Sequence, residues 1–437
     1  MGTAAYDGGN GATLYVDAYL GPPGSGSDLM KIGSSAGTTW VVVHDTNSGA
    51  GSYNPKGIPV VQVYDGGSVQ NPGNFLLSGG PVDKGLFTYD LYFDNGTSPQ
   101  SKLPKGIDDQ WVLASTPNAR AFQLATIQSG IQTLWNDGLQ TWHDRTTDLR
   151  NVPGAPAVRP SGAWLVGFGS QFDRDVTHTV TAFNTTTQVP GDYRQFTNGA
   201  IGGIDTTISN NGRERWVVGL LGGFESSSLH FTNSPTASTD LQGNTVGGYA
   251  TYLKDGLFID TLVKGDFLTV KHHTTGAFAD QASGSATAVG VIVDGGYRMD
   301  GAGGSYVEPL ATLAYVRTTM DSFGFLGNQV SFPSGENVEG RLGLRVGTTL
   351  PTSYGRFNPF LTASLWQTFT GSSPVTFSAP GSPDLTISDD STGTFYEFGG
   401  GGELFTANGT SAFIKGDYRW GNGVTGGTVR GGLRASW

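Results

Sequence analysis

One segment of this chain, residues 117–150, has the length of a membrane-spanning helix but far too many polar side chains to face lipid. Apolar residues recur along one of its faces at intervals of three or four, as in an amphipathic helix. They are Phe122, Ala125, Ile127, Ile131, Leu134, Leu139 and Trp142. A helix of about 30 residues is roughly 45 Å long, the thickness of a bilayer with its headgroups. Such a helix can cross a membrane only inside a protein wall with a polar inner face, which we call the sheath.

The ends and the polar faces of this helix can also be predicted. Pro117 suits the first helical turn, Ser115 or Thr116 can cap it, and Pro153-Gly154 ends it. We expect the polar faces to contact the wall of the sheath rather than bulk water or lipid. Their side chains are Gln123, Gln128, Gln132, Asn136, Gln140, His143, Arg145 and Arg150.

The composition indicates that the rest of the chain is all-β. Its 437 residues include 69 glycines beside many aromatics, a mixture typical of turn-rich β structure. The formal net charge of −11 argues against nucleic acid as a partner, because nucleic-acid-binding domains are usually basic. The absence of cysteine suits a chain exported unfolded through an oxidising compartment. There is no apolar run of about 18 residues and no signal peptide after Met1, so an exported form has lost its native N-terminus here.

The part of the chain before the helix consists of short predicted strands separated by turns. Residues 1–27 contain one predicted strand, Thr13–Leu20, and we expect them to be one rung of something larger. Residues 28–115 contain closely spaced strands that fit a stacked β-solenoid closing on a sandwich-like cap. The strands are Trp40–His44, Val60–Tyr64, Gly85–Phe93 and Asp109–Leu113.

Beyond a Pro-rich connector, residues 151–160, apolar and polar residues alternate with a period of two. A soluble sandwich places charges outside and aromatics inside, whereas a membrane barrel places lipid outside and a charged, watery lumen inside. Here Tyr, Trp and Phe lie on the apolar face, so we predict an antiparallel transmembrane barrel of about 12 strands in residues 160–437. The predicted lumenal charges are Asp260, Lys264, Asp266, Glu339, Arg341, Arg345, Glu397, Glu403, Lys415, Asp417, Arg419, Arg430 and Arg434.

A purely polar lumen would leave the apolar stripe of the helix without a partner. We therefore expect lumenal aromatics or the N-terminal domain beside Ile127, Ile131 and Trp142.

Several segments resemble a known family in its own order. Residues 27–115, including SDLMKIGSSAGTTWVVVHDTNSGA and GLFTYDLYF, resemble the end of a pertactin-like autotransporter passenger, a β-helix cap that helps the passenger fold. The strands from Trp164–Ser170 to the closing GGLRASW resemble the autotransporter β-domain of type Va secretion. Trp142–Arg150 is similar to that family's pore-helix signature, which ends in Asp-Leu-Arg.

This resemblance implies an all-β fold in which a 12-stranded barrel, threaded by one α-helix, follows the end of a right-handed β-helix with a sandwich-like cap. Residues 1–27 would be a passenger remnant, 28–115 the autochaperone domain, 116–151 the helical linker and 160–437 the translocator. The protein would export its own N-terminal passenger through the bacterial outer membrane to the cell surface, with the helix plugging the pore.

The resemblance also implies how the barrel is assembled. The C-terminal residues match the family's insertion signal, although Ala435 is smaller than usual. These residues are Arg430, Gly432, Leu433, Ala435 and Trp437. The partners would be outer-membrane lipid, the barrel-assembly machinery, periplasmic chaperones and the protein's own passenger, around a monomeric barrel.

No catalytic, cofactor or metal site is expected. Gly33–Gly37 matches Gly-x-Ser-x-Gly, but a nucleophile elbow needs a helix after the motif and none follows. Some relatives cut their own helix at an Asn pair. The corresponding residues here are Gln140-Thr141, so autocleavage by that route is not expected.

Two other classes of protein remain open from the sequence. One is a porin-like channel with a soluble appendage, and the other is a secreted all-β adhesin or hydrolase. Deleting residues 117–150 would raise the conductance of a plugged translocator but hardly change that of an open porin. A secreted protein would be soluble without detergent.

Overall fold

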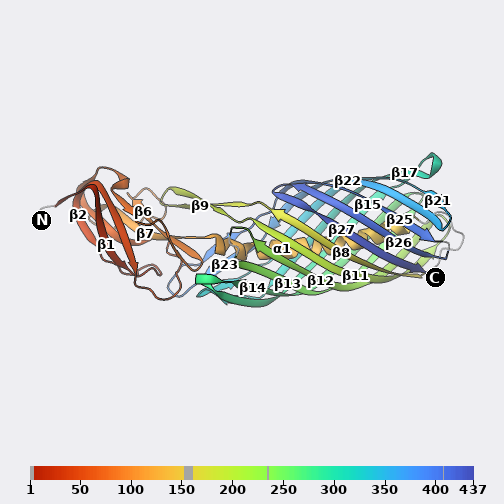
Figure 1. Ribbon diagram of the computed structural model, residues 1–437, viewed down its shortest axis with the longest axis horizontal. Helices are drawn as coiled ribbons and strands as arrows, with labels where there is room; N and C mark the ends of the chain where they lie inside the picture. The colour runs from red at the N-terminus through yellow and green to blue at the C-terminus, as the bar shows by residue number, and fades with distance from the viewer. Residues whose placement is uncertain (1–3, 152–160, 234–235, 407) are drawn as a thin grey trace.

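The computed structural model describes residues 4–151, 161–233, 236–406 and 408–437 (Figure 1). The N-terminal domain and the barrel lie end to end along the long axis, and the helix α1 (Ala119–Arg150) runs inside the barrel. The C-terminus lies at the end of the barrel farthest from the N-terminal domain (Figure 1).

The predicted 12-stranded antiparallel barrel is confirmed. The sheet closes because β15 pairs with β17 and the last strand, β27, pairs with the first, β8. Its strands are β8 (Ser161–Arg174), β11 (Tyr193–Asn210), β12 (Glu214–Phe231), β13 (Ala237–Lys254), β14 (Leu257–Thr274), β15 (Asp280–Tyr297), β17 (Ser305–Met320), β20 (Gly335–Thr348), β22 (Gly355–Ser372), β25 (Gly393–Thr406), β26 (Thr410–Gly421) and β27 (Val424–Ser436). Two short strands, β16 (Met299–Asp300) and β21 (Leu350–Thr352), extend the far end.

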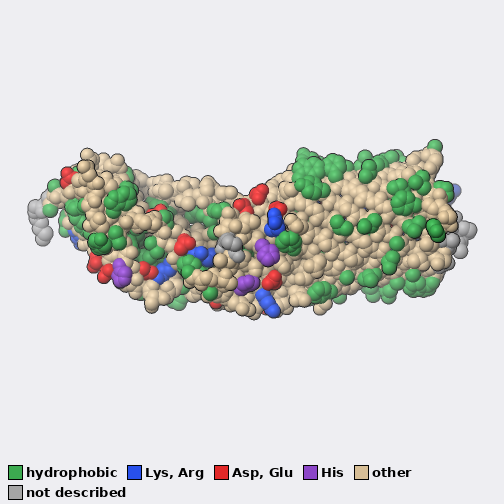
Figure 2. Space-filling view, viewed as in Figure 1, with side chains coloured by type: hydrophobic (Ala, Val, Ile, Leu, Met, Phe, Trp, Pro, Cys, Tyr) green, Lys and Arg blue, Asp and Glu red, His purple; other side chains and the backbone are tan. Residues whose placement is uncertain are grey.

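The two faces of the barrel wall have opposite chemistry. In β20 the side chain of Leu342 is 64% exposed on the outside, whereas its neighbour Arg341 is 7% exposed on the inside. In β26, Ile414 and Tyr418 face outward and Lys415 faces inward. On the visible face, charged side chains lie over the N-terminal domain and its junction with the barrel, while the barrel surface beyond is mostly apolar or uncharged (Figure 2). An apolar outer surface around a charged interior is the arrangement of a membrane barrel.

The N-terminal domain is built on one sheet that changes from parallel to antiparallel pairing. Consecutive strands β1, β2 and β3 pair in parallel, and β7, β6 and β5 continue the sheet antiparallel. The elements are β1 (Ala5–Ala18), β2 (Met30–Asp45), β3 (Ile58–Val69), the short helix η1 (Pro72–Asn74), β4 (Phe75–Leu77), β5 (Val82–Lys84), β6 (Phe87–Asp94) and β7 (Ile107–Pro117). The Gly33–Gly37 motif lies inside β2, so it forms no strand-to-helix turn.

The first strand begins earlier than the sequence indicates. We predicted Thr13–Leu20, whereas β1 already pairs with β2 at Ala5. The pairing shifts register between Asp7 and Ala12, where glycines at 8, 9 and 11 allow bulges. These bulges interrupt the alternation of apolar and polar residues, so the sequence pattern does not reveal the first half of the strand.

The predicted start of the helix is wrong. Pro117 is the last residue of β7 and pairs with Phe87, and Asn118 is the N-cap, whose side chain accepts a hydrogen bond from the Arg120 N–H at 3.0 Å. Ser115 cannot cap the helix because it is buried in the N-terminal domain, where its hydroxyl donates to Ser52 O. The predicted stop at Pro153-Gly154 lies outside the described residues.

Long connections extend the barrel at the end that faces the N-terminal domain. Between β8 and β11 the chain forms a hairpin, β9 (Thr177–Ala182) with β10 (Thr185–Pro190). Two other connections join in a four-stranded sheet of β18 (Phe323–Phe325), β19 (Asn328–Ser331), β23 (Pro374–Ser378) and β24 (Leu385–Ser388). The short helix η2 (Gly276–Phe278) also lies in a connection, and η3 (Ala302–Gly304) lies between β16 and β17.

Candidate functional site

The candidate site is the barrel lumen with the helix inside it. Nearly every side chain of α1 is buried, and the helix lies against strands β8, β11, β12, β13, β14, β15, β17 and β20 of the wall. Its last turns lie at the far end of the barrel, where the Asn151 amide donates to Glu403 at 2.7 Å. The helix therefore passes through the lumen from one mouth to the other.

Three basic side chains in the last turns of α1 each face a wall carboxylate. The pairs are His143 with Asp294 at 2.5 Å, Arg145 with Asp205 at 2.6 Å and Arg150 with Asp260 at 3.0 Å. Arg145 binds Asp205 through two parallel hydrogen bonds, and the Tyr249 hydroxyl donates a third to the same carboxylate at 2.6 Å. These carboxylates belong to β11, β14 and β15.

The acidic side chains of α1 contact a different part of the wall. The contacts are Asp137 with the Ser170 hydroxyl at 2.6 Å, Asp144 with Arg430 at 2.7 Å and Asp148 with Arg434. The three partners lie on the adjacent strands β8 and β27, where the sheet closes. At about 100° per residue, positions 137, 144 and 148 fall within about 40° of one another. The acids thus form one line along the helix.

The inner wall has an acidic part and a more basic part, which face the basic and the acidic side chains of the helix. From β11 to β17 its buried charges are mainly acidic, and from β20 to β27 they include most of its basic residues. The acidic part holds Asp205, Glu225, Asp260, Asp266, Asp294 and Glu308, with Lys264, and the other part holds Arg341, Arg345, Lys415, Arg419, Arg430 and Arg434, with Glu339, Glu397, Glu403 and Asp417. A helix rotated about its axis would bring its acids toward the acidic part. The charges therefore select one rotation of α1.

Predicted lumenal charges also pair with one another or with Glu225, either within one strand or between strands one or two positions apart in the sheet. These pairs are Lys264 with Glu225 and Asp266 at 3.1 Å each, Arg345 with Glu403 at 3.1 Å, Arg419 with Glu397 at 2.9 Å, Lys415 with Asp417 at 3.2 Å and Arg430 with Asp417 at 2.6 Å. Arg341 donates to the Ser364 hydroxyl at 2.9 Å. Pairing of this kind offsets much of the cost of removing charges from water.

At Gly138 a wall carboxylate lies directly against the helix backbone. A Cβ atom there would lie 1.7 Å from Glu225 Oε1, and Lys264 Nζ donates to Trp135 O at 3.1 Å. Only glycine leaves room for this buried ion pair against the helix.

The polar amides predicted on the helix faces have mixed environments. Gln128 donates to Pro333 O at 2.9 Å, and Asn136 donates to Glu339 at 3.3 Å. Gln123 and Gln140 are buried. Gln132 is 2% exposed, yet neither its carbonyl oxygen nor its amide nitrogen has a hydrogen-bond partner among the described atoms.

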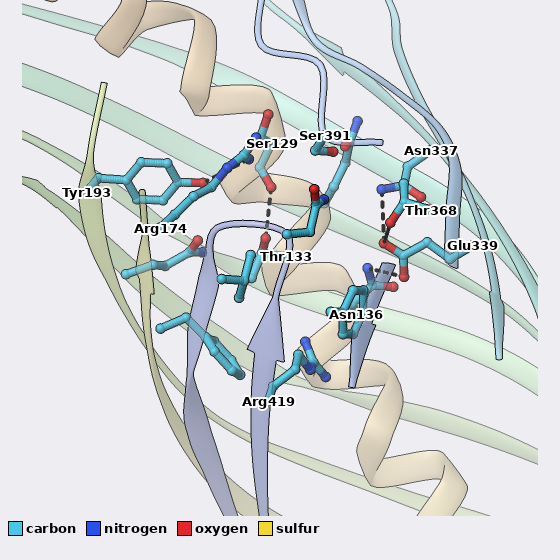
Figure 3. Close-up of a pocket in the computed structure, with 16 residues that line it drawn as sticks. Ser129, Thr133, Asn136, Arg174, Tyr193, Asn337, Glu339, Thr368, Ser391 and Arg419 are labelled. Atoms are coloured by element: carbon cyan, nitrogen blue, oxygen red, sulfur yellow. Dashed lines mark hydrogen bonds between the residues drawn. The ribbon is translucent and has the colours of Figure 1, made fainter. Parts of the chain in front are cut away.

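Gln132 borders a polar cavity of about 90 Å³ between the helix and the wall (Figure 3). Ser129, Thr133 and Asn136 line it from α1, and Glu339 and Arg419 line it from β20 and β26. This volume can hold several water molecules, which supply the partners that buried amides need. On this side the helix is packed less tightly against the wall.

The lumen is not purely polar, so the apolar stripe of the helix has partners there. Toward the N-terminal domain the inner wall carries buried apolar side chains such as Leu229, Leu241 and Val270, which form one apolar cluster with Ile127 and Ile131. Lumenal aromatics, among them Trp164 and Phe168, belong to the same cluster, as does Trp142. The lumen therefore has an apolar part for the stripe and a charged part for the last turns.

The C-terminal residues lie on the closing strand. Leu433 and Trp437 are 62% and 59% exposed, and Ala435 lies on the same outer face of β27. Arg430 faces the lumen, and Gly432 shares that inner face.

Several residues of the site were not predicted. Asp137, Asp144 and Asp148 share a face at helical spacing, a signal that the sequence contains. Their wall partners have no comparable signal, because the pairing depends on how the barrel closes. Among residues that the structure describes, no group of His, Cys, Asp and Glu side chains is placed to hold a metal ion. In the described ranges, no helix is both long and apolar enough to cross a membrane.

A closed antiparallel barrel with an apolar exterior, a charged lumen and one helix inside defines an outer-membrane barrel. Residues 163–417 match the family model described as the autotransporter beta-domain. The chain therefore belongs to the autotransporter β-domain family, and its barrel is an outer-membrane translocator domain.

Known proteins agree with this assignment. The chain is 29% identical over 248 residues to the pertactin autotransporter of Bordetella parapertussis, covering 56% of this chain and 25% of the relative. It thus spans about a quarter of the length of that relative. Its fold matches the transport unit of AIDA-I from Escherichia coli (TM-score 0.50, 16% identity, 67% of this chain and 97% of that one). It also matches the translocator domain of NalP from Neisseria meningitidis (TM-score 0.50, 14% identity, 70% and 99%).

Replacing Arg145 with Met should destabilise the barrel strongly. The substitution leaves Asp205 buried without its cation, which typically costs about 3–5 kcal/mol. The free energy of unfolding in detergent, followed by heat-modifiable gel migration, measures the loss. A matched control is Arg194→Met, because Arg194 makes the same two-bond contact with Asp173 on the exposed rim. Equal losses in the two variants would contradict a structural role for the buried pair.

Proposed function

We propose that this protein exports its own N-terminal segment through the barrel and then anchors it at the cell surface, with α1 closing the pore. The path of the chain carries the proposal. The N-terminal domain lies at one mouth, α1 crosses the lumen, and β8 starts at the opposite end, where Ser161 pairs with Thr206. The N-terminal domain therefore lies at the end of the barrel opposite to the start of β8. If β8 starts on the periplasmic side, the domain must have crossed the membrane.

The connections of the barrel support an orientation in the membrane. Outer-membrane barrels have short periplasmic turns and longer extracellular loops. The hairpin β9–β10 and the four-stranded sheet extend from the end that faces the N-terminal domain. That end is the cell-surface side in our proposal, and the C-terminus is periplasmic. Export draws its free energy from insertion of the barrel and from folding of the passenger outside, without ATP.

The domain limits follow from the same proposal. Residues 1–27 are the remnant of a β-helical passenger, 28–115 its folding-promoting cap, 116–151 the pore helix and 160–437 the translocator. Parallel pairing of β1 with β2 supports the first assignment, because parallel neighbours are how successive rungs of a solenoid stack.

Deleting residues 119–150 should open the pore. The purified wild-type protein is expected to show little conductance in planar bilayers, and the deletion should raise it, because the helix occupies the lumen along its whole length. A control that replaces the same residues with a Gly-Ser linker of equal length should also conduct. A porin-like channel, the alternative class, would conduct before the deletion and change little after it.

We further propose that the barrel is monomeric and that the barrel-assembly machinery, supplied by periplasmic chaperones, recognises its last strand. Leu433, Ala435 and Trp437 all lie on the outer face, where a protein partner can reach them before lipid does. Removing Trp437 should lower the amount of heat-modifiable barrel in outer membranes. An unchanged amount would argue against this signal.

The protein acts as a single chain without catalysis in this proposal. Gln140-Thr141 stands where cleaving relatives carry an Asn pair. Fragments divided near residue 140 in purified outer membranes would contradict it.

A further inference from the structure

The hairpin β9–β10 belongs to the barrel but is packed against the N-terminal domain (Figure 1). At its tip the Phe183 ring stacks on the Tyr92 ring, with centroids 5.6 Å apart. Phe183 forms a small buried apolar cluster with Ala182 of the hairpin and with Tyr92, Val112 and Ala114 of β6 and β7. Without the hairpin, this face of β6 and β7 would be exposed apolar surface.

The turn that presents Phe183 has an unfavourable backbone conformation. Phe183 and Asn184 have φ angles of 45° and 60°, in the left-handed region. Two-residue hairpin turns of this kind favour Asn-Gly or Gly-Gly, and a phenylalanine there is strained. Strain is retained where the surrounding structure requires it. Here the turn places the Phe183 ring on Tyr92 and lets Asn184 donate to the Thr97 hydroxyl at 3.2 Å.

A second barrel extension contacts the same domain from elsewhere. In the four-stranded sheet, Phe325, Val330 and Phe377 are buried in one apolar cluster with Phe87 of β6. In the connection between β23 and β24, the Ser382 hydroxyl donates to Tyr53 O at 3.0 Å. The hairpin thus covers β6 and β7, while the second extension contacts the N-terminal domain at Tyr53.

We propose that the β9–β10 hairpin is a folding platform for β6 and β7, the part of the N-terminal domain that directly precedes the pore helix. This inference rests on the proposed function, because it applies only to a chain that emerges through the barrel. Residues next to α1 leave the pore first in hairpin-like export, before the parallel rungs are complete. Phe183 gives them an apolar partner that does not depend on the rest of the passenger.

Replacing Phe183 with Asn tests the platform in the full chain. Asparagine tolerates the left-handed conformation, so the turn is kept while the ring is lost. In cells, pulse-labelled protein is followed for arrival of the N-terminal domain at the surface and for its acquisition of protease resistance. We expect resistance to appear about three- to tenfold more slowly, because the lost aromatic contact acts in the folding transition state. Surface arrival and heat-modifiable barrel should not change.

Two controls make the result specific. Thr187→Ala alters an exposed residue of the same hairpin and leaves both the ring and the turn unchanged, so it should acquire resistance as fast as wild type. Tyr92→Leu removes the stacking from the other side and should reproduce the delay. Wild-type kinetics in Phe183→Asn would overturn the platform. Failure of the unaltered chain to reach the surface would overturn the proposed function, and the platform with it.

Discussion

Charges inside a barrel that is closed and filled by a helix have little water around them, so each needs an opposite charge or a hydrogen bond. The last turns of α1 meet this requirement through the wall, with Arg145 on Asp205, Asp144 on Arg430 and Asp148 on Arg434. The acids point to β8 and β27, which pair where the sheet closes, and the basic side chains of the helix point to β11, β14 and β15. Rotation of the helix about its axis would break several of these pairs together. The observed rotation of α1 is therefore lower in free energy than other rotations.

The position of the charged turns also determines where the other parts of the helix lie. Because the charged turns occupy the far mouth, residues 121–136 of α1, which carry no charge, lie toward the N-terminal domain, where the inner wall becomes apolar around Leu229 and Val270. The helix then emerges directly into the N-terminal domain, since Asn118 caps it and also donates to Gly85 O at 3.0 Å. The cavity beside Gln132 lies where the helix is held neither by ion pairs nor by close apolar contacts with the wall.

Much of this architecture can be predicted from the sequence because it depends on local patterns of apolar and polar residues. The alternation of Arg341 with Leu342 shows which face is lumenal, and the length and polarity of residues 117–150 require an enclosing wall. The start of the helix could not be placed this way, because Pro117 and Ser115 serve the last strand of the preceding domain. The ion pairs also could not, since Asp205 and Arg145 are brought together only by closure of the barrel and the rotation of the helix.

A disulfide between the helix and Ser373, the residue that directly follows wall strand β22, measures most directly whether α1 occupies this position in the membrane. The chain contains no cysteine, and the Ser129 and Ser373 hydroxyl oxygens lie 3.1 Å apart. In outer membranes from cells expressing the Ser129→Cys/Ser373→Cys variant, mild oxidation should join the two residues in nearly all molecules. The pair Ser129→Cys/Leu361→Cys, with Leu361 on the lipid side of the wall, should remain reduced. Free thiols in the first variant, or a cross-link in the second, would contradict a helix seated by its charges inside the barrel.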